Sequence, residues 1–117
     1  MSCEIFNNND FGMIEGSQQT IELDLYNILG EKYENVAISS VEWRMSYYGE
    51  TECLVSKNSV DNPNEISNEE NKISITILSK DTQNLFGKFT HQVIITDIHD
   101  SIFVADLGKI TIKPQIK

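Results

Sequence analysis

Several features that the sequence has little of limit what this protein does. Arg44 is the single arginine among nine basic residues, while 18 acidic residues bring the net charge to −9. Binding to phosphate groups needs clustered lysine and arginine, so this balance disfavours a nucleic-acid or anionic-membrane surface. Solubility explains the surplus of acid better than an acidic binding patch does. No apolar run approaches the roughly 20 residues of a membrane-spanning helix.

Cysteine is also scarce, since the chain contains only Cys3 and Cys53. One lies near the N-terminus and the other in a strand-like run, and we expect no disulfide between them. The first ten residues lack the basic region and the apolar region of a signal peptide. We therefore expect the protein to be made and kept in a cytoplasm, with its thiols reduced.

No catalytic motif is visible in the sequence. No serine or cysteine stands in a nucleophile motif, and no glycine-rich loop is suited to cradle phosphates. We accordingly expect no enzymatic activity, no cofactor and no metal. His91 lies on the apolar face of a predicted strand, where a packed histidine with a satisfied ring is expected more often than a ligand or a base.

Two polar stretches have an alternative interpretation as metal sites. His99 with Asp97 and Asp100 has suitable ligand types, but aspartate favours turns and no second ligand group follows at a recognisable spacing. The run Asp61–Glu65 resembles a calcium loop in composition, yet it lacks the alternate oxygen ligands and the glycine at the sixth position. Turn chemistry is the preferred interpretation of the first stretch, and a solvated loop that of the second.

The most informative part of the sequence is Asp81–Lys113, which predicts a turn followed by a long hairpin. Apolar side chains and His91 alternate with polar ones from Phe89 to Thr96, with Ile94 as the one apolar exception, which is the period of a half-buried strand. The segment Asp97–Ser101 is rich in turn-forming residues, and Ile102–Leu107 is the predicted returning strand. The residues predicted to face one side are Phe89, His91, Val93 and Ile95, followed on the return by Phe103, Ala105 and Leu107.

The parity of the alternation changes at Gly108. Ile110 and Ile112 are even-numbered, whereas Phe103, Ala105 and Leu107, the apolar set of the preceding segment, are odd-numbered. One inserted residue at a glycine switches the face that a strand buries, so the sequence predicts a β-bulge or kink at Gly108. Pro114 cannot donate a ladder hydrogen bond, and we expect the strand to end there.

The rest of the chain predicts further strands separated by polar turns. A single helical turn is expected near Asp81–Leu85, and the polar run Lys57–Asn71 is predicted as a solvated loop that either carries the interaction surface or is mobile, with mobility preferred. Residues 1–19 are predicted as an N-terminal arm or short edge strand, and 20–117 as the domain. The further strands are Thr20–Tyr26, Val36–Tyr48 with Val41, Trp43, Met45 and Tyr47 facing inward, Thr51–Ser56, and a strand with Ile73, Ile75 and Ile77 facing inward.

Short strands at this spacing, without sustained helical periodicity, predict an all-β fold: an antiparallel immunoglobulin-like β-sandwich of about seven strands. Trp43 stands where a core tryptophan of an inner strand belongs. Phe89 replaces the corner tyrosine of antibody domains, and His91 replaces their second cysteine. An antibody-type domain with its inter-sheet disulfide is therefore excluded.

Taken together, these elements resemble the small immunoglobulin-like accessory domains of tailed bacteriophages, found in head, neck, tail or baseplate proteins. The resemblance covers most of the chain from about Thr20 onward. It is carried by strand and turn signatures: Ile21-x-Leu23-x-Leu25 before Gly30, Val41-Glu42-Trp43, Ile73-x-Ile75-x-Ile77, Asp81-Thr82-x-x-Leu85-x-Gly87-x-Phe89, Val93-Ile94-Ile95-Thr96-Asp97, and Gly108-Lys109-Ile110-Thr111-Ile112.

This resemblance implies a virion or phage-tail-like structural component without catalytic activity. Its implied partners are other phage structural proteins or further copies of itself, held through edge strands or a docked arm such as Met1–Gln19, with weak glycan contact at a host surface as an additional role. The alternative is a carbohydrate-binding or cell-surface-binding β-sandwich module. Tyr26 and Tyr48, on the polar faces of their strands, are the aromatic residues that such a surface would use.

Overall fold

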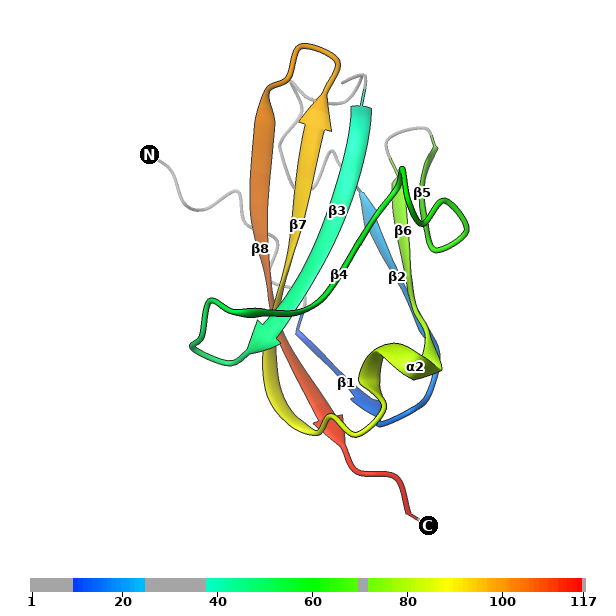
Figure 1. The fold of residues 1–117 in the computed structure, drawn as a ribbon, viewed down its shortest axis with the longest axis vertical. Coiled ribbons are helices and arrows are strands. Elements are labelled where there is room, and N and C mark those ends of the chain that lie inside the picture. Colours follow the sequence, from blue (N-terminus) through cyan, green and yellow to red (C-terminus); the bar gives the residue numbers. More distant parts are fainter. Residues whose placement is uncertain (1–9, 25–37, 70–71, 117) are drawn as a thin grey trace.

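The computed structural model describes residues 10–24, 38–69 and 72–116, and it has two β-sheets packed face to face (Figure 1). Short runs of alternating apolar and polar residues form the strands, because alternation buries one face of each. The elements are β1 (Phe11–Ile14), β2 (Gln19–Asp24), β3 (Ile38–Tyr47), β4 (Cys53–Asn58), β5 (Ile66–Glu69), β6 (Lys72–Ile77), α2 (Ser79–Thr82), β7 (Gly87–Asp97) and β8 (Ile102–Lys113).

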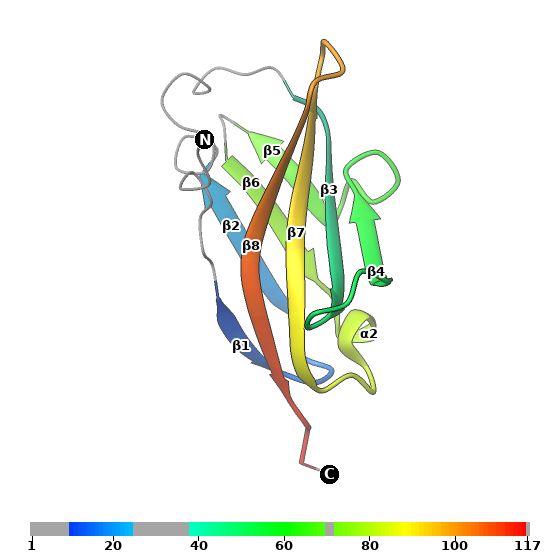
Figure 2. The ribbon, with the colours of Figure 1, turned by 90° about the vertical axis from the view of Figure 1, so that its left-hand side faces the viewer.

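The two sheets have the strand orders of an immunoglobulin-like sandwich. The larger sheet, called sheet A, has the order β1-β8-β7-β3-β4, and the smaller, sheet B, has the order β2-β6-β5. Neighbouring strands are antiparallel except β1 and β8, which are parallel. Figure 2 shows β8, β7 and β3 of sheet A in front of sheet B. The predicted fold class is confirmed, with eight described strands where about seven were predicted.

The core lies between the two sheets and is built from the inward side of each alternating run. Trp43 and Phe89 are the largest fully buried side chains. The inward prediction fails at Tyr47, which is 44% exposed. Tyr47 is the last residue of β3, and its ring stacks on Phe89 with the centroids 5.3 Å apart, so it covers the rim of the core. The other buried apolar residues are Met13, Ile21, Leu23, Val41, Met45, Ile66, Ile73, Ile75, Ile77, Val93, Ile95, Ile110 and Ile112.

The predicted bulge at Gly108 is confirmed. His91 pairs with Gly108 while the next residue, Gln92, pairs with Asp106, so β8 carries one extra residue at this point. Gly108 has a φ of +115°, a conformation that L side chains rarely adopt. The bulge switches the buried parity, which lets Ile110 and Ile112 enter the core. The strand ends at Lys113, before Pro114, as predicted.

The prediction of a solvated loop over Lys57–Asn71 is wrong at both of its described ends. Lys57 is the fifth residue of β4 and is buried, and Ile66 begins β5 and is 1% exposed. The strand β5 pairs antiparallel with β6. A four-residue strand with one inward apolar side chain leaves no visible alternation in the sequence. The predicted strand Thr51–Ser56 is likewise displaced, because the β3–β4 connection continues to residue 52.

The N-terminal segment is an edge strand over Phe11–Ile14. Met13 is buried in the core, and Asp10 Oδ1 accepts a hydrogen bond of 2.7 Å from the backbone N–H of Lys109, next to the bulge. Glu15, also buried, accepts through Oε2 from the backbone N–H of Asn84 at 2.7 Å, which ties β1 to the segment after α2. Residues 1–9 of the predicted arm lie outside the described residues.

Candidate functional site

The buried polar pair at the centre of sheet A is structural. Trp43 on β3 and His91 on β7 are both fully buried, and the indole Nε1 donates a hydrogen bond of 3.2 Å to His91 Nδ1. The edge of the Phe11 ring packs against the same imidazole at 5.3 Å between centroids. Since Nδ1 accepts this bond, it carries no proton. The prediction of a packed, satisfied histidine is confirmed.

A second buried polar group joins β4 to the loop before β5 and to α2. Lys57 Nζ donates to Glu65 Oε1 at 2.7 Å, to the backbone carbonyl of Thr76 at 3.0 Å, and to Asp81 Oδ2. The Lys57 side chain is 3% exposed, and the side chains of Glu65 and Asp81 are 18% and 10% exposed. The run Asp61–Glu65, which resembles a calcium loop in composition, therefore ends in a carboxylate that neutralises a buried lysine.

The residues around His99 form a turn, as predicted. Asp97 Oδ1 accepts from the backbone N–H groups of His99 at 2.8 Å and Ser101 at 2.9 Å, and Asp100 adopts a φ of +64°. Within the described residues, no group of three or more His, Cys, Asp or Glu side chains is placed to hold a metal ion. In the same residues, no helix is long and apolar enough to cross a membrane. Cys53 is a free, exposed thiol, and Cys3 lies outside the described residues.

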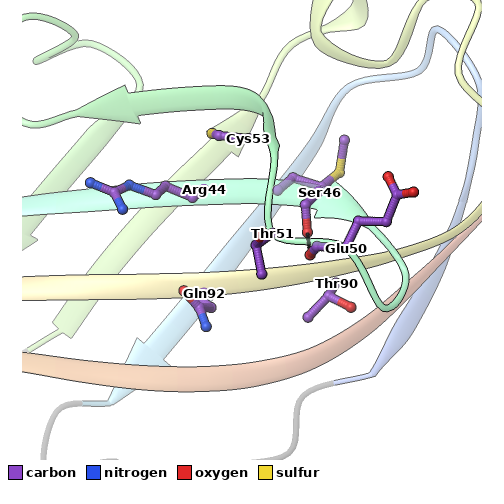
Figure 3. Close-up of a pocket in the computed structure, with 8 residues that line it drawn as sticks. Arg44, Ser46, Glu50, Thr51, Cys53, Thr90 and Gln92 are labelled. Atoms are coloured by element: carbon purple, nitrogen blue, oxygen red, sulfur yellow. Dashed lines mark hydrogen bonds between the residues drawn. The ribbon is translucent and has the colours of Figure 1, made fainter.

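The outer face of sheet A carries a cavity of about 180 Å³ where the β3–β4 connection folds over the strands, here called the outer-face cavity. Figure 3 shows the Thr51 side chain projecting from this connection over β7, close to Gln92. The Ser46 hydroxyl donates to the Glu50 carbonyl at 3.0 Å and holds the connection in place. The cavity is lined by Arg44, Met45, Ser46, Glu50, Thr51, Cys53, Thr90 and Gln92.

The charge at one side of this cavity is already partnered. Arg44 donates through Nε and Nη2 to the two carboxylate oxygens of Glu42, both at 3.0 Å. These hydrogen bonds, and the Coulombic attraction of the same carboxylate, raise the pKa of Arg44 above its ordinary value. The guanidinium of Arg44 therefore stays charged. Because it is also exposed, it places a positive charge at the edge of the outer-face cavity.

Tyr48 lies in the turn between β3 and β4 and is 61% exposed. It is thus an accessible aromatic residue on the connection that forms the outer-face cavity, although it does not line the cavity itself. Tyr26, the other aromatic predicted for surface binding, lies outside the described residues. The cavity was not found from the sequence, because a tertiary feature, the folding of a connection over the sheet, creates it.

Apolar residues gather at the hairpin end of β7 and β8, and we call them the apolar patch: Ile94, Ile102 and Val104 on the outer face of sheet A, with Ile98 in the turn that follows β7. Ile94 pairs with Val104 across the β7–β8 ladder, and both alternate with residues that face the core. Three members are widely exposed: Ile98 at 62%, Ile102 at 65% and Val104 at 50%. The patch lies beyond the cavity, toward the Asp97–Ser101 turn.

Comparison with known proteins bears on the fold. No protein-family model and no curated protein matches the chain. Among solved structures, 323 chains match, so the likeness is to a widespread fold. One is a crystal structure of a chicken TCR, with a TM-score of 0.60 and 10% sequence identity over 95% of this chain; this chain spans 56% of that one. At that identity the likeness establishes the immunoglobulin-like sandwich and leaves the function to be argued from the site.

Proposed function

We propose that this protein is a non-catalytic structural or accessory component of a tailed-phage virion or phage-tail-like particle. It works through protein contacts in the head, the neck, or the tail and baseplate. The sequence elements that resemble phage immunoglobulin-like domains support this proposal. The observation that carries it in the structure is the apolar patch on the outer face of sheet A.

The patch differs from the other exposed apolar residues because two of its members, Ile94 and Val104, are paired across one ladder. Scattered apolar residues on a surface are normal, but neighbouring ones on one sheet face mark contact with another molecule. Ile94 and Val104 are cross-strand partners, and Ile102 lies two residues before Val104 on the same face. Such a flat face suits a protein partner that covers it in the assembled particle.

Particle incorporation tests the proposal directly. Particles from the bacterium that encodes the chain are induced, separated on a density gradient, and analysed by mass spectrometry. We expect the chain to sediment with capsid or tail proteins. A double variant, Ile102→Ser with Val104→Thr, should fold but leave the particle fraction. Val60→Ser, at a 71% exposed residue outside the patch, is the matched control and should remain with the particles.

Two results would count against this role. One is recovery of the wild-type chain only in the soluble fraction of a lysate that contains intact particles. The other is equal incorporation of the double variant and the control. The genes next to the coding sequence give an independent check, because capsid, tail or baseplate genes are expected there.

A second candidate function is binding of a carbohydrate or cell surface. It is favoured by the exposed ring of Tyr48 on the connection that forms the outer-face cavity. If Tyr48 stacks on a sugar, Tyr48→Ala should abolish binding to a glycan array on which the wild-type chain gives a signal.

A further inference from the structure

We infer that the outer-face cavity is a binding site for a single neutral sugar ring, presented as the terminal residue of a glycan. The inference rests on the geometry of the cavity. It requires neither the virion role nor stacking on Tyr48, which does not line the cavity.

Three of the polar side chains around the cavity are free to bind a ligand. In the described part of the chain, the side chains of Thr51, Thr90 and Gln92 make no hydrogen bond with another residue. The Glu50 carboxylate is likewise uncommitted, since only its backbone carbonyl is bonded, to Ser46. One strand and one connection therefore bring two hydroxyls and an amide to the lining of one cavity, while the Glu50 side chain points away from Thr51, Thr90 and Gln92 (Figure 3).

These groups select a ligand by chemistry. Threonine hydroxyls and the glutamine amide both donate and accept. Sugar hydroxyls also donate and accept, so they match this set. A phosphate or carboxylate ligand would need a cation, and the nearby cation, Arg44, is held by Glu42. An apolar ligand would leave the polar groups unpaired, which is costly.

The size of the cavity indicates a ligand with a single sugar ring. Its volume is about 180 Å³. A single pyranose displaces a similar volume, while a disaccharide would extend into solvent. Because no aromatic side chain lines the cavity to stack on the ring, we expect weak binding, with a Kd on the order of 1 mM.

Amide chemical-shift titration of the intact chain tests this site. The probes are glucose, galactose, mannose and N-acetylglucosamine, together with their methyl glycosides, at up to about 100 mM, roughly a hundred times the expected Kd. We expect at least one sugar to give saturable shifts confined to residues 44–53 and 90–92. Binding of a methyl glycoside identifies a glycan terminus, and binding of the free sugar alone would overturn that part of the inference.

Two matched threonines on β7 provide the control. Thr90→Val removes a hydroxyl from the cavity and should weaken binding about tenfold, the effect of one lost hydrogen bond. Thr96→Val makes the same change on the same face, opposite Ile102 and outside the cavity, and should leave binding unchanged. The inference is overturned if no sugar gives saturable shifts, if the shifts lie elsewhere, or if both variants weaken binding equally. Particle incorporation is measured in a separate experiment, so the outcome of the sugar titration neither supports nor contradicts the virion proposal.

Discussion

Trp43 and His91 are joined by a buried hydrogen bond of 3.2 Å between indole Nε1 and imidazole Nδ1, across neighbouring strands of sheet A. In antibody domains the corresponding region of the core holds a tryptophan against a disulfide. Here a hydrogen bond between two rings takes the place of that cross-link. It links β3 to β7 within one sheet, whereas a disulfide would link the two sheets.

This pair is expected to be energetically coupled. His91→Phe leaves the buried indole N–H without its acceptor and should lower the free energy of unfolding by about 1–3 kcal/mol. In the double variant with Trp43→Phe no unpaired donor remains, so the combined loss should be smaller than the sum of the single losses by about 1 kcal/mol. Urea unfolding followed by far-ultraviolet circular dichroism measures all three. Strict additivity would show that the hydrogen bond contributes nothing.

Removal of the buried ammonium should be among the most damaging single changes. Lys57→Met leaves Glu65 and Asp81 close together without a counter-charge, and breaking such a buried group costs about 3–5 kcal/mol. Lys80→Met, at an exposed lysine of α2, should change stability by no more than about 0.5 kcal/mol. Urea midpoints of the two variants provide the comparison, and similar values would mean that the ion pairs are not a stabilising unit.

Two glycines on adjacent strands should respond in opposite ways to alanine. Gly108→Ala places a side chain at a φ of +115° and should destabilise the protein by about 1–3 kcal/mol. At Gly12 an added Cβ would meet the carbonyl oxygen of Thr111 at 3.5 Å, an ordinary contact. Gly12→Ala should therefore be neutral or stabilise by up to about 1 kcal/mol. Thermal unfolding of both variants tests this, and a neutral Gly108→Ala would contradict the bulge geometry.

The strand β1 should behave as part of the fold. Met13 is 7% exposed and Ile14, its neighbour, is 46% exposed. Met13→Ala should cost about 2–5 kcal/mol, and Ile14→Ala only about 0.5 kcal/mol. The urea unfolding midpoints of the two variants show whether β1 contributes to the stability of the fold. If both substitutions are harmless, β1 detaches at little cost, and the segment is available to a partner as an arm.

The sequence predicted those parts of the fold in which alternation is long or changes parity. The strand β7 and the bulge at Gly108 are of this kind, because each leaves a pattern in neighbouring residues. The strand β5 leaves none, since Ile66 is the one apolar residue that it buries. The burial of Lys57 could not be predicted from the sequence either, because its carboxylate partners, Glu65 and Asp81, lie 8 and 24 residues away in the chain.

The candidate site was less predictable than the fold. Tyr48 was found because an aromatic residue on a polar face is visible in the sequence. The outer-face cavity depends on the β3–β4 connection folding over β7, and no local pattern of Thr51 or Gln92 signals this. Contacts made by a loop against a distant strand are decided by tertiary packing, which single-sequence periodicity does not encode.

The ion pairs of Lys57 also bear on self-association. The strand β4 stands at the end of sheet A, where its outer side is open to pairing with another chain. An inward-pointing charge on an edge strand is one of the ways in which natural sheets discourage such pairing, since a strand added alongside would have to accommodate that charge in its own packing. Lys57 therefore disfavours the pairing of another strand at the β4 edge.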